Sequence, residues 1–412
     1  MSLADERAEL GGLIVQLGLS MTMAGESVNN VQDRLYRIAV AKGFNDVAVI
    51  ALPTSLFVEL GSGGRTNVQL GVPTGRELRL DQVTHLYELV RELEENEVTT
   101  TVAAQRLEGL LAAPPRFGRI VRITGYAVMC SGLSLLLQPS WGGLVGSFVL
   151  GLLVGVLTTW RFMSLSMVLP VLSSFLVAGI VFAAAKWIDG IDNPIRSLIP
   201  PLITFLPGAI LTTATVELAA GQVISGSTRL IQGVIVLGMM AFGIVAAAEL
   251  VGAPRAHLLD QPFDRLGPWA PWVGLGVITF GHFLYNCAPA RTVLPILLVL
   301  VVAYVGQRLG ALVFDASVSG FFGALAMTPI VLWMSTQRWG PPSMVTFLPA
   351  FWLLVPGAAG LIGATEIVGT DSTLETSDFS AAVNTVFSIT LGVLIGTSIY
   401  NSTLVSVKRW RR

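Results

Sequence analysis

Two Pro-Gly pairs interrupt long apolar stretches of the sequence, and a glutamate follows each pair. The first pair, Pro207-Gly208, is followed by Glu217. The second pair, Pro356-Gly357, is followed by Glu366 at the same spacing of ten residues from proline to glutamate. Proline removes a backbone donor and glycine adds conformational freedom, so a helix breaks at such a pair. In lipid, the freed backbone groups persist only where protein or a water-filled cavity satisfies them, which is typical of transporters with internal repeats.

Each predicted break places helix N-terminal amides on one side and bare carbonyl groups on the other. The amides suit a carboxylate and the carbonyls suit an ammonium group or another cation, so an amino-acid zwitterion would use both. Thr212 and Thr213 follow the first break, and Asn286 belongs to a polar cluster with His282 and Tyr285 late in another apolar stretch. These features predict a substrate site formed by Pro207, Gly208, Thr212, Thr213, Pro356, Gly357 and Asn286.

Charged residues inside or at the ends of apolar stretches are the candidates for coupling or gating. Glu217 and Glu366 would lie about 15 Å past their breaks at 1.5 Å per residue, near opposite membrane surfaces. Simple interfacial carboxylates at helix ends are an equally good interpretation of both. Asp315 lies five residues inside a predicted span, where it would carry a proton or cap a turn at headgroup depth. Arg229 is a basic residue between two apolar stretches and joins these acids. The predicted coupling set is therefore Glu217, Asp315, Glu366 and Arg229.

Charge is unevenly distributed along the 412 residues, and this asymmetry predicts two kinds of domain. Ten Lys or Arg and 15 Asp or Glu fall in residues 1–118, against 15 and 11 in the remaining 294 residues. Overall the chain is 12% charged and 53% hydrophobic, whereas soluble domains are about 25% charged. We therefore expect a polar N-terminal domain followed by an integral membrane domain.

Residues 1–118 are predicted to form a cytosolic α+β domain. Apolar periodicity predicts, in chain order, helices at 6–24 and 27–43, strands at 47–60 and 66–72, and a helix at 81–111 with a break near 96–101. Gly61-Ser-Gly-Gly64 between the strands is typical of a hairpin turn, and it lacks the Lys-Ser/Thr of a phosphate-binding loop.

The remaining sequence contains ten apolar stretches of the length needed to cross a bilayer. They are 119–138, 143–160, 164–187, 197–218, 228–249, 268–287, 290–307, 310–335, 343–367 and 380–404. The two Pro-Gly breaks then fall in the fourth stretch of each half, residues 119–249 and 250–412. Each half has five spans, which is an odd number, so the second half must cross the membrane in the opposite orientation to the first. This predicts a 5+5 inverted repeat. Coincidence is the competing explanation, since Pro and Gly are frequent in membrane helices. The excess of Lys and Arg in the loops predicts that both termini are cytoplasmic.

Several short motifs resemble the threonine/serine exporter family. They are Ala24-Gly-Glu-Ser-Val-Asn-Asn-Val-Gln-Asp33, Leu52-Pro-Thr-Ser-Leu-Phe-Val58, Phe205-Leu-Pro-Gly208 with Glu217, Ser225-Gly-Ser-Thr-Arg-Leu230 and Val355-Pro-Gly357. The resemblance implies export of threonine and serine from a bacterial cytoplasm, driven by the proton motive force. A similar two-subunit bacterial system carries its two halves as separate chains, which agrees with an inverted repeat.

The sequence thus predicts a multi-pass exporter of the bacterial inner membrane that works by proton-coupled antiport and alternating access. The expected partners are a small amino acid, protons and the lipid bilayer, and an oligomer is compatible with this prediction. We expect no enzymatic activity or catalytic residue, no cofactor, no metal and no nucleic acid. A dicarboxylate exporter, with a substrate like succinate, is the nearest alternative. A membrane-anchored hydrolase or sensor acting through the N-terminal domain is the more distant one.

Overall fold

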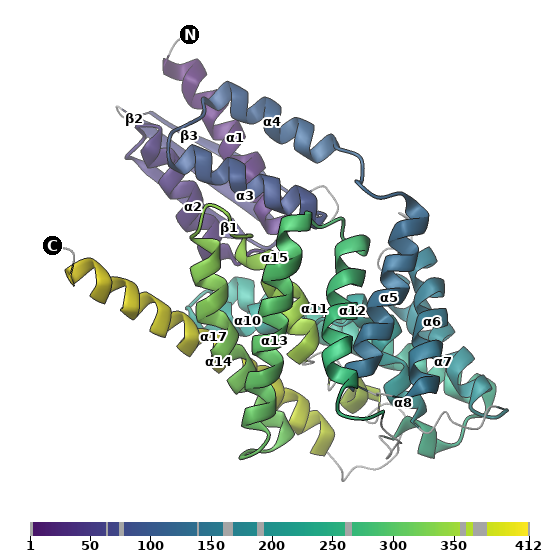
Figure 1. Cartoon of the computed structure of the whole chain (residues 1–412). Helices are drawn as coiled ribbons and strands as arrows, with labels where there is room; N and C mark the ends of the chain where they lie inside the picture. Colours follow the sequence, from purple (N-terminus) through teal and green to yellow (C-terminus); the bar gives the residue numbers. More distant parts are fainter. Residues whose placement is uncertain are drawn as a thin grey trace. The chain divides into compact units, whose positions relative to one another are not determined.

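The computed structural model describes most of the chain (Figure 1). The chain forms two compact units. The described residues are 3–62, 65–73, 78–137, 140–159, 168–187, 193–259, 266–354, 360–365 and 377–410. The first unit contains Met1–Arg116 together with Val216–Arg229, and the second contains Phe117–Thr215 and Leu230–Arg412. A short segment from the middle of the membrane domain therefore belongs to the same unit as the N-terminal domain.

A three-stranded antiparallel sheet forms the β part of the first unit. Its strands are β1 (Val47–Leu52), β2 (Ser55–Ser62) and β3 (Arg65–Gly71), in that order. The predicted single strand at 47–60 was wrong, because Leu52 pairs with Ser55 across a tight turn at Pro53-Thr54. Proline cannot donate to a strand ladder, so it ends β1. The predicted hairpin between the second and third strands is confirmed by the pairing of Ser62 with Arg65.

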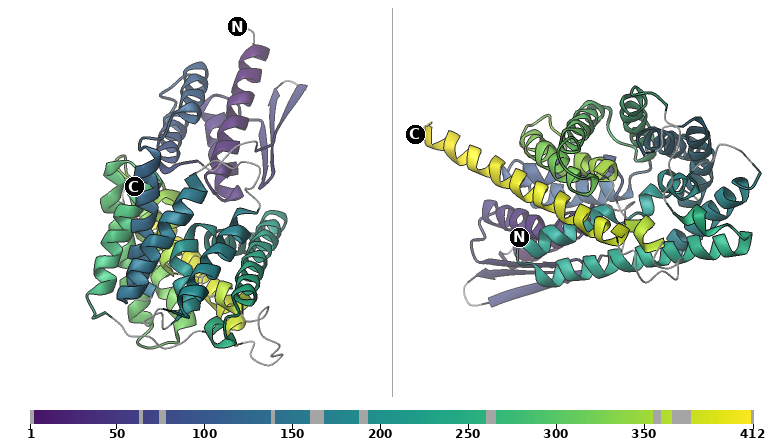
Figure 2. Two further views of the ribbon diagram at one scale, coloured as in Figure 1. Left: turned by 90° about the vertical axis from the view of Figure 1, so that its right-hand side faces the viewer. Right: turned by 90° about the horizontal axis from the view of Figure 1, so that it is seen from below.

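Four helices complete the N-terminal part of this unit among the residues that the structure describes. They are α1 (Leu3–Met23), α2 (Val28–Ala41), α3 (Leu80–Glu94) and α4 (Thr100–Ala112). Figure 2 shows α1 lying along the sheet. Gly18 permits the close approach, because a Cβ atom there would lie 2.7 Å from Leu35 of α2 and would also collide with Leu56 of β2. The predicted break between α3 and α4 is confirmed.

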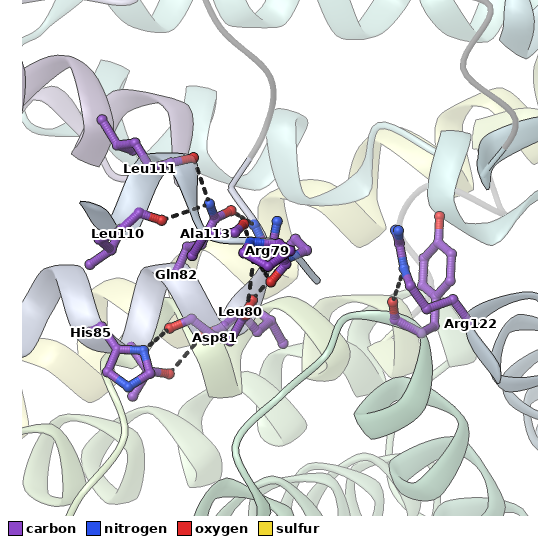
Figure 3. A network of polar contacts seen from close by, with 12 residues as sticks. Arg79, Leu80, Asp81, Gln82, His85, Leu110, Leu111, Ala113 and Arg122 are labelled. Carbon is purple, nitrogen blue, oxygen red and sulfur yellow. Dashed lines mark hydrogen bonds and ion pairs between the residues drawn. The ribbon is translucent and has the colours of Figure 1, made fainter. Parts of the chain in front are cut away.

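Polar contacts bind the end of α4 to the start of α3 (Figure 3). Gln82 accepts the backbone N–H of Arg79 at 3.1 Å and donates its amide to the carbonyl oxygens of Leu110 and Leu111. Arg79 pairs with Asp81 and also donates to the carbonyl oxygen of Ala113. The two helices are thereby held as one antiparallel pair.

The regular elements described in the membrane domain are all helices. Its first half contains α5 (Arg119–Leu137), α6 (Trp141–Thr159), α7 (Leu169–Ala184), α8 (Pro194–Ser197), α9 (Ile199–Leu202), η2 (Ile203–Phe205), α10 (Gly208–Ala219) and α11 (Val223–Val251). Its second half contains η3 (Arg255–Leu258), α12 (Ala270–Tyr285), η4 (Ala290–Thr292), α13 (Val293–Gly310), α14 (Ala316–Ser335), α15 (Ser343–Leu354) and α17 (Ser377–Trp410).

The described helices make the chain a multi-pass membrane protein. A helix overlaps each of the ten predicted stretches, and six of the described helices are long and apolar enough to cross a membrane. A bent pair, Pro194–Phe205 with Gly208–Ala219, would make a seventh span, and α7 and α15 are shorter apolar helices. The count of ten spans and the inverted repeat therefore stay predictions.

Glycines allow the first helix of each half, α5 and α12, to pack closely. A Cβ atom on Gly125 would lie 2.6 Å from the Cβ of Leu284, and one on Gly132 would lie 2.9 Å from the carbonyl oxygen of Gly274. The early residues of α5 therefore meet the late residues of α12, so the two helices are antiparallel. Small residues at helix contacts are how membrane helices gain van der Waals packing without a hydrophobic driving force.

Candidate functional site

The predicted break at Pro207 is present, and it bends an apolar helix sharply. The segment Pro194–Phe205 and helix α10 are inclined at 63° to each other across Leu206-Pro207. Leu206 is extended, with ψ of 123°, as expected for a residue that precedes proline. The carbonyl oxygen of Pro207 then accepts the N–H of Leu211 at 2.8 Å and starts the new helix. Pro207 and Gly208 are both buried, so this break lies inside the protein.

Threonine hydroxyls line the first turns of α10 after the break. Thr212 is fully buried and donates to the carbonyl oxygen of Gly208 at 2.9 Å, while Thr213 is half-buried. Thr215 bonds to the hydroxyl of Thr390 on α17. The donated protons leave the hydroxyl oxygens free to accept from an ammonium group. Thr390 was not among the predicted site residues, because only the tertiary structure brings α17 to α10.

Tyr126 of α5 supports the segment upstream of the break, and it too was missed. Its side chain is fully buried, and its hydroxyl donates to the carbonyl oxygen of Pro201 at 2.8 Å and lies 3.0 Å from the hydroxyl of Thr204. Pro201 lies in the last turns before the break at Leu206-Pro207, where the helix ends and its last carbonyl groups need another partner. That need is a signal in the sequence, although it does not say which tyrosine meets it.

Two of the three polar residues at the end of α12 contact each other. The Asn286 amide lies 3.0 Å from Nδ1 of His282. The His282 ring is fully buried and meets Trp352 of α15 edge to face, with ring centroids 5.4 Å apart. Tyr285 packs edge to face against Tyr126 at 4.8 Å. Contacts of α12 therefore reach both the support of the first break and the helix that precedes residues 356–357.

A residue with positive φ ends this helix. Cys287 has φ of 54°, which is uncommon for a residue other than glycine, and the N–H of Ala288 closes the turn onto the carbonyl oxygen of Phe283 at 3.1 Å. Arg122 donates to the carbonyl oxygen of Tyr285 at 3.2 Å, also visible in Figure 3. The helix end that carries Asn286 is therefore held from two sides.

Glu217 and Arg229 form a buried ion pair in the first unit. Arg229 Nε and Glu217 Oε2 are 3.2 Å apart, and the two side chains are 11% and 0% exposed. Both residues were predicted as coupling candidates, but their pairing was not, because they lie on either side of the turn between α10 and α11. Glu217 is in the last turn of α10, so it lies away from the break, as expected.

The other predicted coupling residues have different surroundings. Asp315 is exposed and precedes the first residue of α14, while α13 ends at Gly310. The prediction that Asp315 lies five residues inside a helix was therefore wrong, because the apolar run crosses a loop. Pro356, Gly357 and Glu366 lie outside the described residues.

The N-terminal domain has a hollow of about 310 Å³ between α3 and α4, beside the network in Figure 3. Its polar lining includes Asp81 and Arg106. These two groups are already paired, Asp81 with Arg79 at 3.0 Å and Arg106 with Glu92. The hollow therefore offers a ligand little unpaired charge from these two residues.

A family described as "Putative threonine/serine exporter" matches residues 12–251 of the chain. This range runs from α1 to the end of α11. It includes the break at Pro207, the threonines of α10 and the Glu217–Arg229 pair.

Curated relatives come from yeasts and share the name "Pheromone-regulated membrane protein 10". The protein from Eremothecium gossypii is 23% identical over 421 residues, which cover 95% of this chain and 55% of that protein. The protein from Zygosaccharomyces rouxii is 24% identical over 50% of this chain and 23% of its own length. The protein from Candida glabrata is 26% identical over 49% of this chain and 28% of its own length. The chain thus spans about half the length of the Eremothecium gossypii protein, although almost all of the chain is matched. No solved structure matches it.

Proposed function

The chain belongs to the threonine/serine exporter family, and we propose that it exports threonine and serine in exchange for protons, by alternating access. The observation that carries this proposal is the 63° break at Pro207, inside an apolar helix whose next turns are lined by hydroxyl groups. Broken helices of this kind form the substrate sites of many secondary transporters.

The chemistry of the break fits a small hydroxylated amino acid. The N-terminus of α10 at Gly208 presents amides and the positive end of the helix dipole to a carboxylate. The oxygens of Thr212 and Thr213 would accept from the ammonium or side-chain hydroxyl of the substrate. The proposed substrate site is thus the predicted one, with Pro356, Gly357 and Asn286 contributed by the second half.

Helix packing supports the proposed inverted repeat. The first helices of the two halves, α5 and α12, pack antiparallel, as two elements related by an axis in the membrane plane would. The helices of the third and fifth predicted stretches in each half also meet at a glycine. Gly243 of α11 lies against Val171 and Phe175 of α7, and Gly392 of α17 lies against Phe321 and Leu325 of α14.

Glu217 is the coupling residue that the structure supports best, because it is a fully buried carboxylate paired with Arg229. A carboxylate in such a place changes its interactions when it gains a proton. We therefore expect Glu217→Gln to slow proton-coupled export while the protein still folds. The coupling role of Glu366 remains part of the proposal, whereas Asp315, exposed ahead of α14, is proposed to be a helix-end residue at headgroup depth.

The alternative of a dicarboxylate exporter depends on an extra cation for a second carboxylate. Arg229 could supply such a cation, but it is bound to Glu217. A zwitterionic substrate is therefore the better match. The proposed location is a bacterial plasma membrane with both termini in the cytoplasm, as the distribution of Lys and Arg indicates.

Counterflow in proteoliposomes tests the proposal. Vesicles loaded with unlabelled threonine should accumulate labelled threonine and serine but not succinate, and an imposed pH gradient should accelerate export. Accumulation of succinate alone would favour the dicarboxylate alternative, and no exchange of any of the three would refute the proposed function.

A further inference from the structure

The segment Val216–Arg229 joins two membrane helices, yet it belongs to the same compact unit as the N-terminal domain. It contains the last turn of α10, a tight turn and the first two turns of α11. Gly221 has φ of 82°, and the N–H of Gln222 bonds to the carbonyl oxygen of Glu217 at 2.9 Å. This segment is therefore a compact hairpin that presents Glu217 and Arg229 together.

Both ends of the hairpin bond to one turn of the N-terminal domain, the turn between α1 and α2. Glu217 Oε1 accepts the backbone N–H of Val28 at 3.0 Å. Arg229 donates to the carbonyl oxygen of Glu26 at 3.1 Å. Since Val28 is the first residue of α2, the carboxylate of Glu217 also faces the positive end of that helix. We refer to the hairpin residues Glu217 and Arg229, with residues 25–28 of the turn, as the clamp.

The turn itself is fixed by a buried carboxylate. Gly25 has φ of 86°, a conformation that favours glycine. Glu26 is only 3% exposed, and its side chain accepts from the Tyr87 hydroxyl and, at 2.8 Å, from the Asn30 amide. Burial, and then the charge of Glu26, raise the pKa of Tyr87 well above its ordinary value. The phenol therefore keeps its proton and continues to donate throughout the neutral pH range.

Stability alone is a weak explanation for this arrangement. Replacing a buried ion pair by apolar residues of similar volume is often neutral or stabilising. Such a pair does, however, accept few alternative geometries, because each charge needs its partner. The clamp therefore favours one position of the α10–α11 hairpin on the N-terminal domain.

We propose that the α1–α2 turn positions helix α10 for transport through this clamp, and that Glu26 and Tyr87 are positioning residues. This inference rests on the proposed function. A continuous helix runs from Gly208, beside the break, to Ala219, two residues past Glu217. Because a helix is stiff over three turns, a change at Glu217 is transmitted to the break.

The Tyr87→Phe variant tests this inference, because it removes one hydroxyl that contacts neither the hairpin nor the break. Tyr36→Phe is the matched control, since Tyr36 is 50% exposed on α2. In the full-length protein in nanodiscs, hydrogen exchange of residues 24–31 and 216–229 should accelerate by about ten-fold in Tyr87→Phe, the effect of losing one hydrogen bond to a carboxylate. The Tyr36→Phe variant should exchange like the wild type.

Transport kinetics separate positioning from a merely structural role. In proteoliposomes, Tyr87→Phe should lower the maximal rate of threonine counterflow and leave the KM unchanged. Combining Tyr87→Phe with Glu217→Gln should slow transport no further than the slower single variant, because both changes release the same clamp. Wild-type exchange and kinetics in Tyr87→Phe, or effects that multiply in the double variant, would overturn the inference. Hydrogen exchange needs no substrate, so it still decides whether the clamp exists if the wild type carries neither threonine nor serine.

Discussion

The two ends of helix α10 carry different kinds of polar group. At the Pro207 end, the polar groups are hydroxyls and backbone atoms, such as the buried Thr212. At the Glu217 end, a carboxylate and a guanidinium are buried together. Neutral groups suit a ligand that brings its own charges and must leave again, whereas a buried ion pair suits a partner within the chain. The comparison separates a proposed binding end from a proposed holding end of one helix.

The largest effect is expected from Pro207→Ala, which removes the cause of the break. The variant restores a backbone donor and allows a straight helix. We expect transport to fall by roughly two orders of magnitude, while stability is kept or raised, because proline inside a helix costs about 3 kcal/mol. Counterflow measures the transport rate, and thermal unfolding in detergent measures the stability. Pro329→Ala is the control, since Pro329 lies inside α14 where the helix continues; equal loss in both variants would contradict the special role of Pro207.

At the other end of α10, Arg229→Met should destabilise the first unit by about 3 kcal/mol, because it leaves the Glu217 carboxylate buried without its cation. The double variant Arg229→Met with Glu217→Leu should recover most of that loss. Thermal unfolding, monitored through the proteolysis of the N-terminal domain, measures the difference in stability between the two variants. A double variant as unstable as Arg229→Met alone would show that packing, not charge, holds this end.

A smaller effect is expected from Tyr126→Phe, which leaves the carbonyl oxygen of Pro201 without its donor. An unsatisfied buried acceptor costs about 1–3 kcal/mol. The unfolding temperature in detergent should fall, and transport should fall with it if the upstream segment moves. Tyr304→Phe on α13 provides a control in another membrane helix, and an equal change in both variants would remove Tyr126 from the support of the break.

The smallest effect is expected from Asp315→Asn. Asp315 is exposed and precedes α14 without a side-chain hydrogen bond that caps the helix, and asparagine suits this position about as well as aspartate. Export should therefore stay within about two-fold of the wild type. A large loss of pH-dependent export would restore the coupling role that the sequence suggested and would weaken the contrast between Glu217 and the other acids.

Local chemistry made several features predictable from sequence. The Pro207-Gly208 pair favours a break, because proline lacks an N–H and glycine adds conformational freedom. The apolar stretches identify membrane helices by length and composition. Asp315 shows the limit of this approach. Hydropathy continues across the loop between α13 and α14, so an average over a window places the residue inside a helix that begins one position later.

The sequence by itself therefore determined the class of protein, the first broken helix and most of the polar residues around it. Only the tertiary structure decided which of these residues meet. Thr215 with Thr390, Tyr126 with Pro201, and Glu217 with both Arg229 and Val28 are pairs from different elements. The reason is physical: a residue's own chemistry says which partner it needs, but helix packing decides which of many suitable partners comes within hydrogen-bond distance.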